Sequence, residues 1–446
     1  MAIKVGFVSL GCNKNLCDTE NMMGLLAQSG FEITPDPYEA QVCIVNTCGF
    51  IESAKQESID TILEMAQYKE DGNCILLVVC GCLAQRYEKE IREEMPEVDV
   101  IVGTTAIEDI VTAVKEGLLN QKKSYIYDID KCIGENLPRI RTTPQYTAYI
   151  KIAEGCDNRC TYCAIPYIRG KYRSRKMEDI LSEARALADD GVREIIVVAQ
   201  DTTRYGIDLY GERKLSELLE KLCEIPKIEW VRVHYCYPEQ IDEKLIKTMK
   251  EQEKIVKYLD IPVQHGCDSV LKRMGRKTDG KSIEMLIETL RREIPDITLR
   301  TSIIAGFPGE TEEEFDELCT FLKKVRFDRV GVFAYSCEEG TPAAKMKGQL
   351  DEETKEKRKD LVMELCQEIS LKRNEEMLGK TVRVITEGFE DNLYYGRSGG
   401  ESIEIDPKIY FGAHRELDAG DFVWVTIKNC DIYDLYGEEC ERTDLE

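Results

Sequence analysis

The stretch Tyr149-Ile-Lys-Ile-Ala-Glu-Gly-Cys-Asp-Asn-Arg-Cys-Thr-Tyr-Cys163 places a predicted β-strand, Tyr149–Ala153, directly before three closely spaced cysteines. Cys156, Cys160 and Cys163 form a C-x3-C-x2-C pattern, with no histidine inside the loop. Iron–sulfur clusters are usually held by four thiolates, and zinc sites normally pair C-x2-C with a second such pair or with histidine. We therefore predict a four-iron cluster with one open iron. Three unrelated free thiols are the alternative, but cysteines are normally buried and scattered.

Residues 145–373 repeat the alternation of a short apolar run with a helical pattern. Strands are predicted at Tyr149–Ala153, Glu194–Ala199, Trp230–His234, Tyr258–Val263, Thr298–Ile304 and Arg329–Tyr335, with helices that include Met177–Asp189, Ile241–Lys250, Ser282–Arg292 and Thr311–Val325. Six such units predict a parallel, partial (β/α)6 TIM-type barrel rather than a closed barrel of eight. Barrel chemistry lies at strand carboxyl ends, where the cysteine loop falls.

Residues 1–118 predict a smaller α/β domain of the flavodoxin-like kind. Strands are predicted at Ile3–Leu10, Gln41–Val45, Cys74–Cys80 and Val98–Val102, with helices at Asp18–Gly30, Ser53–Tyr68 and Arg86–Glu94. Short apolar runs between helical patterns are typical of parallel strands with crossover helices.

Each of the first three strands of this domain is followed by a cysteine beside a glycine, namely Cys12, Cys48 and Cys82. Ligands of open α/β sheets bind outside the carboxyl ends of the strands, and glycine allows close backbone approach. We predict a second three-cysteine cluster site, again with an open iron. Small buried cysteines at strand ends are the alternative. Cys80 also stays a candidate, because residues two apart in a strand point the same way.

The remaining segments are a linker at 119–144 and a C-terminal module at 375–446. A polar helix, Glu352–Met377, leads into that module, where Thr381–Thr386, Gly400–Ile405 and Asp421–Asn429 alternate like strands. This pattern predicts a small all-β barrel of the oligonucleotide-binding kind or a relative.

Composition limits the functional classes. The chain has 446 residues, 19 of them cysteine, and a formal net charge of −24. The cysteine number is odd and the spacing irregular, which favours metal or redox use in a reducing cytoplasm over a disulfide framework. Neither a membrane span nor a signal peptide is evident, so no membrane partner is expected.

The three-cysteine loop of the barrel resembles the signature of the radical S-adenosylmethionine superfamily. The resemblance implies that S-adenosylmethionine chelates the open iron and is cleaved to a 5′-deoxyadenosyl radical, with Tyr162 near its adenine. A surface or core tyrosine is the alternative for Tyr162. In such enzymes the cofactor supplies the difficult chemistry, and the protein binds and shields it.

The complete arrangement is similar to the methylthiotransferases, whose C-terminal module is of the TRAM type. Four segments resemble the RimO branch, which modifies an aspartate of small-subunit ribosomal protein S-twelve: Gly11–Leu16, Asn46–Ser53, Gln200–Thr202 and Ile261–His265. The tRNA-modifying branch, usually with Gln-Asn in place of Gln200-Asp201, is the alternative. A ferredoxin-like carrier is a second one, but carriers usually give every iron a protein ligand.

The resemblance implies two [4Fe-4S] clusters, S-adenosylmethionine, an external electron donor and a sulfur donor. One S-adenosylmethionine would methylate sulfur held at the N-terminal cluster. A second would yield the radical that takes hydrogen from the β-carbon of the aspartate. No protein acid or base is predicted to be catalytic.

Charge bears separately on the substrate. Residues 375–446 contain eighteen Asp and Glu against seven Lys and Arg, a net charge of −11. A module that binds tRNA should be basic, because phosphate contacts supply much of the affinity. We therefore expect a basic ribosomal protein as partner and no nucleic acid as direct substrate, although acidity is also typical of merely soluble domains.

Several further residues are weaker candidates for binding S-adenosylmethionine or substrate. They lie at predicted strand ends or beside the cysteine loop: Glu154, Gln200, Asp201, His234, His265 and the turn Gly306–Gly309. A structural role for each polar residue, and a plain strand-to-helix turn for Gly306, are about equally compatible with the sequence.

Overall fold

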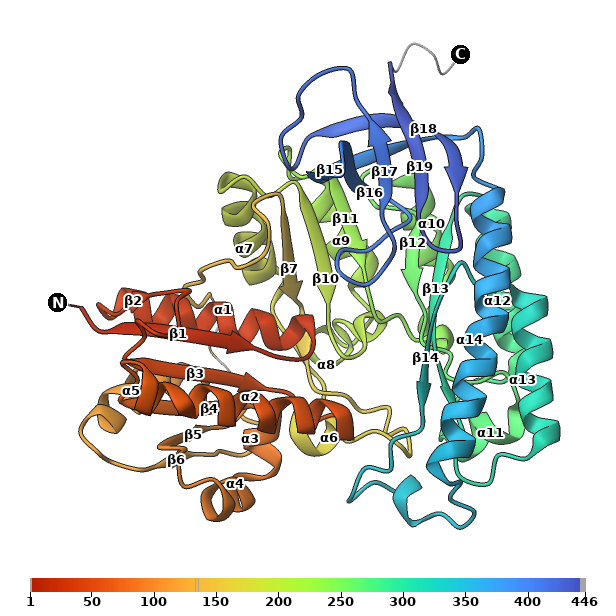
Figure 1. The fold of residues 1–446 in the computed structure, drawn as a ribbon. Helices are drawn as coiled ribbons and strands as arrows, with labels where there is room; N and C mark the ends of the chain where they lie inside the picture. Colours follow the sequence, from red (N-terminus) through yellow and green to blue (C-terminus); the bar gives the residue numbers. More distant parts are fainter. Residues whose placement is uncertain (1, 133, 135, 442–446) are drawn as a thin grey trace.

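The computed structural model describes residues 2–132, 134 and 136–441. The N-terminal module contains β1 (Lys4–Ser9), α1 (Asn13–Gln28), β2 (Glu32–Ile33), β3 (Val42–Thr47), α2 (Glu52–Asp71), β4 (Leu76–Gly81), α3 (Cys82–Arg86), α4 (Glu88–Glu94), β5 (Val100–Val102), the 3-10 turn Ile107–Asp109, α5 (Ile110–Leu118) and β6 (Ser124–Tyr125). Its strands are parallel, in the order β2-β1-β3-β4-β5-β6. This confirms the flavodoxin-like prediction (Figure 1).

The central strands β3 and β4 are buried along their whole length. Parallel strands covered by helices on both faces carry near-continuous apolar runs, which is why the sequence predicted them well. Two details differ. Helix α1 begins at Asn13, directly after an extended Cys12, and not at Asp18. Strand β6 lies inside the predicted linker and pairs with β5.

The central module contains β7 (Thr147–Lys151), β8 (Ala153–Glu154), α6 (Ile165–Ile168), β9 (Arg173–Ser174), α7 (Met177–Asp189), β10 (Glu194–Val198), α8 (Ile207–Tyr210), α9 (Leu215–Cys223), β11 (Trp230–Val233), α10 (Glu243–Glu251), β12 (Tyr258–Asp260), α11 (Asp268–Arg273), α12 (Gly280–Glu293), β13 (Thr298–Ala305), α13 (Glu312–Val325), β14 (Arg329–Ala334) and α14 (Glu352–Glu375). Short 3-10 turns lie at Thr202–Arg204, Pro238–Gln240 and Ala343–Lys345. Strands β7, β10 and β11 pair in parallel, as do β12, β13 and β14. An isolated parallel bridge, Val231 to Ile255, connects the two halves.

This arrangement confirms the predicted partial barrel of six parallel strands. The predicted strand Tyr149–Ala153 is wrong at its end, because β7 stops at Lys151 and Ala153–Glu154 pair instead with β9. Strand β12 also ends early, at Asp260. Pro262 follows two residues later, and proline has no N–H to continue a ladder.

The C-terminal module is a closed barrel of β15 (Thr381–Glu390), β16 (Leu393–Ser398), β17 (Ile409–Gly412), β18 (Phe422–Cys430) and β19 (Leu435–Cys440). It confirms the predicted small β-barrel. The predicted strand Gly400–Ile405 is wrong, because these residues belong to the loop between β16 and β17. Glu401, Ser402 and Ile403 are buried in succession, Glu404 and Ile405 are exposed, and Glu404 has φ +65°, so the alternation in the sequence corresponds neither to strand pairing nor to alternate burial.

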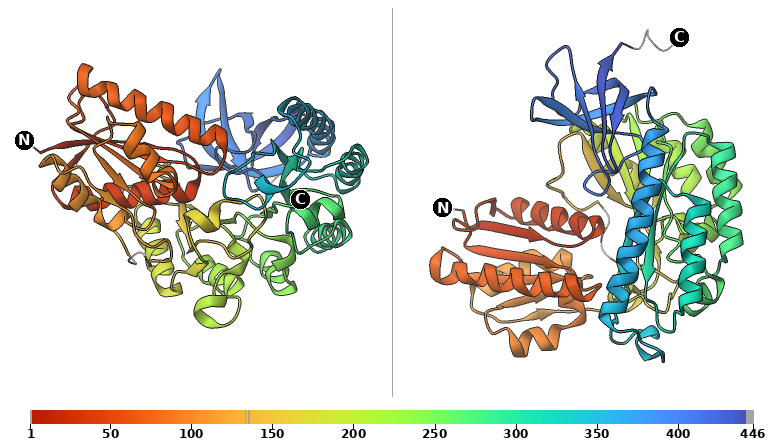
Figure 2. Two further views of the ribbon diagram at one scale, coloured as in Figure 1. Left: turned by 90° about the horizontal axis from the view of Figure 1, so that it is seen from below. Right: turned by 45° about the vertical axis from the view of Figure 1, so that its right-hand side comes forward.

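The two flanking modules lie at opposite ends of the central strands. Contacts from the C-terminal barrel reach Thr147 and Glu194, the first residues of β7 and β10. The N-terminal module lies by the carboxyl ends (Figure 1). Figure 2 shows both on the side of the barrel sheet away from α12 and α13. Among the described residues, no helix has both the length and the apolar character needed to cross a membrane.

Candidate functional site: two three-cysteine sites joined by a buried arginine

Cys156, Cys160 and Cys163, here called the barrel cysteines, lie in the loop that follows β8. All three line one cavity of about 350 Å³. The loop is fixed from two sides: the Cys156 amide donates to Gly170 O at 3.1 Å, and the Thr161 amide donates to Met274 O at 2.9 Å. Three thiols held around one cavity fit a cluster with an open iron.

No three His, Cys, Asp or Glu side chains of the described residues converge on a single metal ion. A four-iron cluster does not need such convergence, because each thiolate binds a different iron. Burial, with Asp201 and Cys160 nearby, raises the pKa of Cys156 to about 12. Without metal the Cys156 thiol is therefore protonated at neutral pH, and cluster binding must displace its proton.

Cys12, Cys48 and Cys82, here called the N-terminal cysteines, lie after β1, after β3 and at the start of α3. A Cβ on Gly11, which has φ +83°, would lie 2.9 Å from the Cys48 sulfur, so only glycine allows this close approach. Burial and the neighbouring Cys82 raise the pKa of Cys48 to about 12, which reflects how near these cysteines are to one another. The structure therefore brings the three predicted ligands together.

The choice between Cys80 and Cys82 rested on strand geometry that does not hold here. Gly81 has φ +92° and turns the chain between β4 and α3. Cys80 consequently lies in the apolar core under the sheet, fully buried, and burial raises its pKa. Cys82 faces the other N-terminal cysteines and is the better placed of the two.

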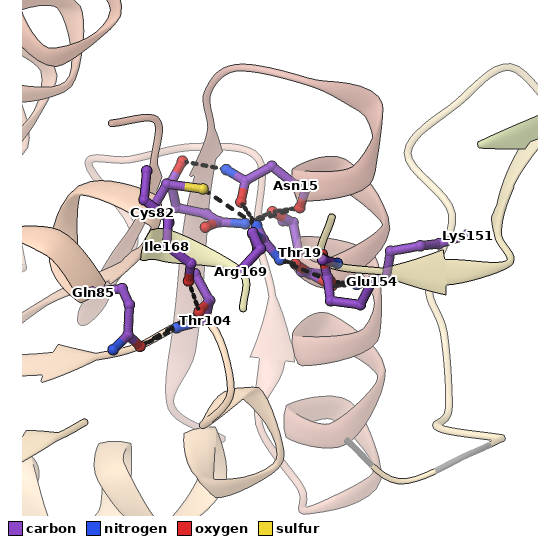
Figure 3. A network of polar contacts seen from close by, with 12 residues as sticks. Asn15, Thr19, Cys82, Gln85, Thr104, Lys151, Glu154, Ile168 and Arg169 are labelled. Atoms are coloured by element: carbon purple, nitrogen blue, oxygen red, sulfur yellow. Dashed lines mark hydrogen bonds and ion pairs between the residues drawn. The ribbon is translucent and has the colours of Figure 1, made fainter. Parts of the chain in front are cut away.

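Arg169 lies between Cys82 of the N-terminal module and Glu154, which directly precedes the loop of the barrel cysteines (Figure 3). One guanidinium nitrogen donates to Asp18 at 2.6 Å and to Glu154 at 3.0 Å. The other donates to Asn15 at 2.9 Å and to the Cys82 sulfur at 3.4 Å. Its side chain is 2% exposed. The arginine of the barrel module thus contacts a cysteine of the N-terminal module directly.

Glu154 continues this network toward the barrel. Its carboxylate accepts from Lys151 at 2.7 Å and from Gln200 at 2.6 Å, and Lys151 also pairs with Asp18. Burial opposes ionisation of Glu154, but Arg169 and Lys151 outweigh burial and hold its pKa well below the usual range. Glu154 and Gln200 therefore lie together beside the cysteine loop, as an ionised carboxylate and a polar partner.

Asp201 contacts the cysteine loop itself. Its carboxylate accepts from Asn158, inside that loop, at 2.7 Å and from Thr203 at 2.6 Å. Burial raises its pKa even though both contacts favour the ionised form. Asp201 thus holds the cysteine loop in place from the end of β10.

Tyr162 packs edge-on against Phe307, with ring centroids 6.5 Å apart, in an apolar cluster. Gly306, just before Phe307, has φ +76°, and a Cβ there would meet Lys355 at 2.7 Å. The Gly306 amide donates to Glu310 at 3.2 Å. The predicted turn after β13 therefore packs behind Tyr162, which places both on one side of the loop.

Two of the candidate residues, His234 and His265, make their hydrogen bonds away from the loop of the barrel cysteines. His234 Nε2 lies 2.9 Å from Ser402 Oγ of the C-terminal loop. Burial, with Arg232 and Arg300 nearby, keeps its pKa well below the usual value. His265 is fully buried, and its Nδ1 accepts from the Cys267 amide at 3.0 Å. These contacts favour the structural alternative, although cofactor binding by His234 stays a prediction.

Sequence reasoning missed Arg169, Lys14 and Tyr235. Lys14 is buried, and its ammonium lies 3.4 Å from the centroid of the Tyr235 ring, across the boundary between modules. Burial opposes ionisation of Cys12, but Lys14 and Arg169 outweigh it and lower the Cys12 pKa. Lys14 could have been found from the sequence, because it is a basic residue two positions after the candidate ligand Cys12. The sequence around Arg169 and Tyr235 contains no comparable signal.

Three family models match this chain in the order of its modules. Residues 4–103 match the uncharacterized protein family UPF0004, residues 150–322 the radical SAM superfamily, and residues 378–439 the TRAM domain. A protein of Acetivibrio thermocellus named ribosomal protein uS12 methylthiotransferase RimO is 53% identical, over 98% of each chain. Its namesake in Clostridioides difficile is 51% identical, also over 98% of each.

The chain belongs to the RimO methylthiotransferase family. It is therefore a radical S-adenosylmethionine enzyme and a transferase, as predicted. Among solved structures, the radical S-adenosylmethionine methyltransferase TsrM from Kitasatospora setae superposes with a TM-score of 0.53 at 14% identity, covering 74% of this chain and 72% of that one. That likeness concerns the fold alone.

Proposed function

We propose that this RimO-family chain methylthiolates the β-carbon of an aspartate in ribosomal protein uS12, using two [4Fe-4S] clusters and S-adenosylmethionine. The observation that carries this proposal is the pair of three-cysteine sites, each short of one ligand, on two modules that the Arg169–Cys82 contact links. Full-length relatives that carry the uS12 methylthiotransferase name support the substrate.

The barrel cysteines would hold the first cluster and the N-terminal cysteines the second. When bound, the clusters supply radical generation from S-adenosylmethionine and a place for sulfur, respectively. The chain's own residues bind and orient. Asp201 fixes the cysteine loop through Asn158, and Glu154 with Gln200 presents an ionised carboxylate and an amide beside it. Tyr162 and the Gly306 turn form an apolar wall that keeps water from one side.

The acidic C-terminal module supports a protein substrate over tRNA. Its net charge of −11 over 375–446 opposes a phosphate backbone and suits a basic ribosomal protein. Such a substrate implies a cytoplasmic enzyme, with a separate electron donor and sulfur donor. The tRNA methylthiotransferase alternative is favoured by no observation here.

Iron content tests the two-site assignment. We expect about eight irons per reconstituted chain, and about four in a variant with all three N-terminal cysteines changed to Ala. That variant should still cleave S-adenosylmethionine, because the barrel cysteines are intact. A Cys132→Ala variant, which changes an exposed cysteine, is the control and should keep every iron.

Mass spectrometry of uS12 from cells without this enzyme tests the substrate. We expect the methylthio group to be absent and to return with the wild-type gene. An unchanged uS12 mass together with hypomodified tRNA would overturn the proposal in favour of the tRNA alternative.

A further inference from the structure

Arg169 is fixed to both modules by its backbone surroundings. It follows α6, six residues after Cys163, and its amide donates to Ile165 O at 2.8 Å. The preceding carbonyl, Ile168 O, accepts from Thr104 of the N-terminal module at 3.0 Å (Figure 3). Position 169 is therefore held with respect to the barrel cysteines and to the N-terminal module.

The charges around its side chain are mostly paired. Arg169 and Lys151 face Asp18 and Glu154, and all four side chains are largely buried. Lys14 is a third buried cation near Glu154, so the cluster of charges can accept a further anion, and a thiolate at Cys82 would have Arg169 as its direct donor. Hydrogen bonds from a guanidinium to an anion are stronger than neutral ones and are directional.

We propose that Arg169 is a positioning residue that fixes Cys82 for cluster binding and makes the N-terminal cluster easier to reduce. It does so from the barrel module, six residues after Cys163. The inference rests on the proposed function, because it takes Cys82 as a cluster ligand. No role in chemistry is assigned to the guanidinium itself; it acts through the cysteine.

Reduction adds one electron to a cluster and makes it more negative. Net charge and hydrogen bonds to the sulfurs are known determinants of cluster potential. A buried cation at 3.4 Å from a ligand sulfur stabilises the more negative form. Loss of Arg169 should therefore lower the potential, whereas loss of a nearby carboxylate should raise it.

The experiment uses the full chain with the barrel cysteines changed to Ala, so that the measured signal comes from the N-terminal cluster alone. After reconstitution, that cluster is titrated with dithionite as electron donor and followed by electron paramagnetic resonance. Iron content and thermal unfolding without iron are measured alongside. The variants in this background are Arg169→Gln, Arg169→Lys and Asp18→Asn, with Arg141→Lys as the matched control. The Arg141 side chain is also largely buried, but it pairs with Asp190 at 2.6 Å.

We expect a more negative potential and less bound iron in Arg169→Gln. Arg169→Lys should be intermediate, because lysine keeps the charge but not the two-pronged geometry. Asp18→Asn should shift the potential in the opposite direction, and Arg141→Lys should change neither the potential nor the iron content. Opposite shifts at two neighbouring positions would not follow from a general loss of structure.

Two outcomes overturn the inference separately from the proposed function. If the parent binds a cluster but its potential and iron content are the same in Arg169→Gln and Asp18→Asn, Arg169 has no such role. If Arg169→Gln does not fold, Arg169→Lys and Asp18→Asn decide by the same criterion. If the parent itself binds no iron, the N-terminal cluster site of the proposed function is wrong.

Discussion

Glu194 is the most strongly enclosed carboxylate between the barrel and the C-terminal module. It is fully buried at the start of β10 and accepts from Arg232 at 3.0 Å and from Arg397 of β16 at 2.9 Å. Burial opposes its ionisation, but Arg397 and Arg232 outweigh burial and lower the pKa of Glu194 to about 2. A single side chain thus connects three elements through charge.

We expect Glu194→Gln to lower the free energy of unfolding by about 3–5 kcal/mol near neutral pH, because it leaves two buried arginines without their carboxylate. The wild-type contribution is present above the ordinary pKa of 4.5 and is lost as pH falls toward the folded value of about 2. The difference in free energy of unfolding between wild type and Glu194→Gln should therefore narrow by about 2 kcal/mol at about pH 3. Urea unfolding followed by circular dichroism measures both free energies.

Glu229→Gln is the matched control. Glu229 also pairs with an arginine of the C-terminal module, Arg383 at 2.8 Å, but both side chains are about one-third exposed. An exposed pair of this kind is worth roughly 0–1 kcal/mol. An equal loss of unfolding free energy in Glu194→Gln and Glu229→Gln would contradict the conclusion that burial makes the Glu194 ion pairs important for stability.

The loop between β16 and β17 enters the barrel from its amino end. Ile403 packs against Tyr149 and Ile196, and the Tyr258 hydroxyl donates to Asp406 at 2.7 Å. Arg232 donates to Gly399 O at 3.0 Å. An open barrel of six strands leaves interior surface uncovered, and this loop covers part of it. The C-terminal module is therefore part of the barrel's core as well as an appendage.

Asp406→Ala should destabilise the chain by about 3 kcal/mol, because it leaves the Tyr258 hydroxyl and the Ser402 amide unpaired in a buried place. The urea midpoint, at an unchanged m-value, measures this. Asp418→Ala, at an exposed position of the same module, should change the midpoint little. A similar small change in both would show that the loop does not hold the modules together.

The N-terminal module and the β15–β19 barrel of the acidic module lie at opposite ends of the central strands (Figure 1). The barrel cysteines follow β8 beyond the carboxyl end of β7, whereas the β15–β19 barrel contacts the strand starts and its β16–β17 loop reaches His234, just after β11. A substrate that reaches the cysteine sites while it is bound to the β15–β19 barrel extends along the central strands. Charge on the distant module would then attract the substrate without taking part in the reaction.

Affinity for uS12 should fall as salt rises, because salt screens attraction between exposed charges. Calorimetry between about 0.05 and about 0.5 M KCl, spanning a several-fold change in screening length, measures the slope. A reduced slope is expected when exposed acids of the module, such as Asp391 and Glu416, are changed to amides. An affinity that does not change with salt would contradict attraction by charge.

Much of the architecture could be predicted because its signals are local. Six apolar runs, each followed by a helical pattern, predicted the barrel strands, and glycine beside cysteine at three strand ends predicted an N-terminal site. The Gly400–Ile405 error has a different origin: the sequence alternates there, but residues 401–403 are all buried and Ile405 is exposed, because the segment is a loop packed against another module. The helix Met177–Asp189 was predicted with the bounds that the structure has.

What the sequence determined by itself was the module order and the two cysteine sets, because strand periodicity and ligand spacing involve residues close along the chain. Only the tertiary structure decided that Arg169 meets Cys82, 87 residues earlier, and that Ser402 meets His234, 168 residues earlier. The physical reason is that such contacts depend on how modules pack. Packing is set by the sum of many buried surfaces, and no single stretch of sequence carries that sum.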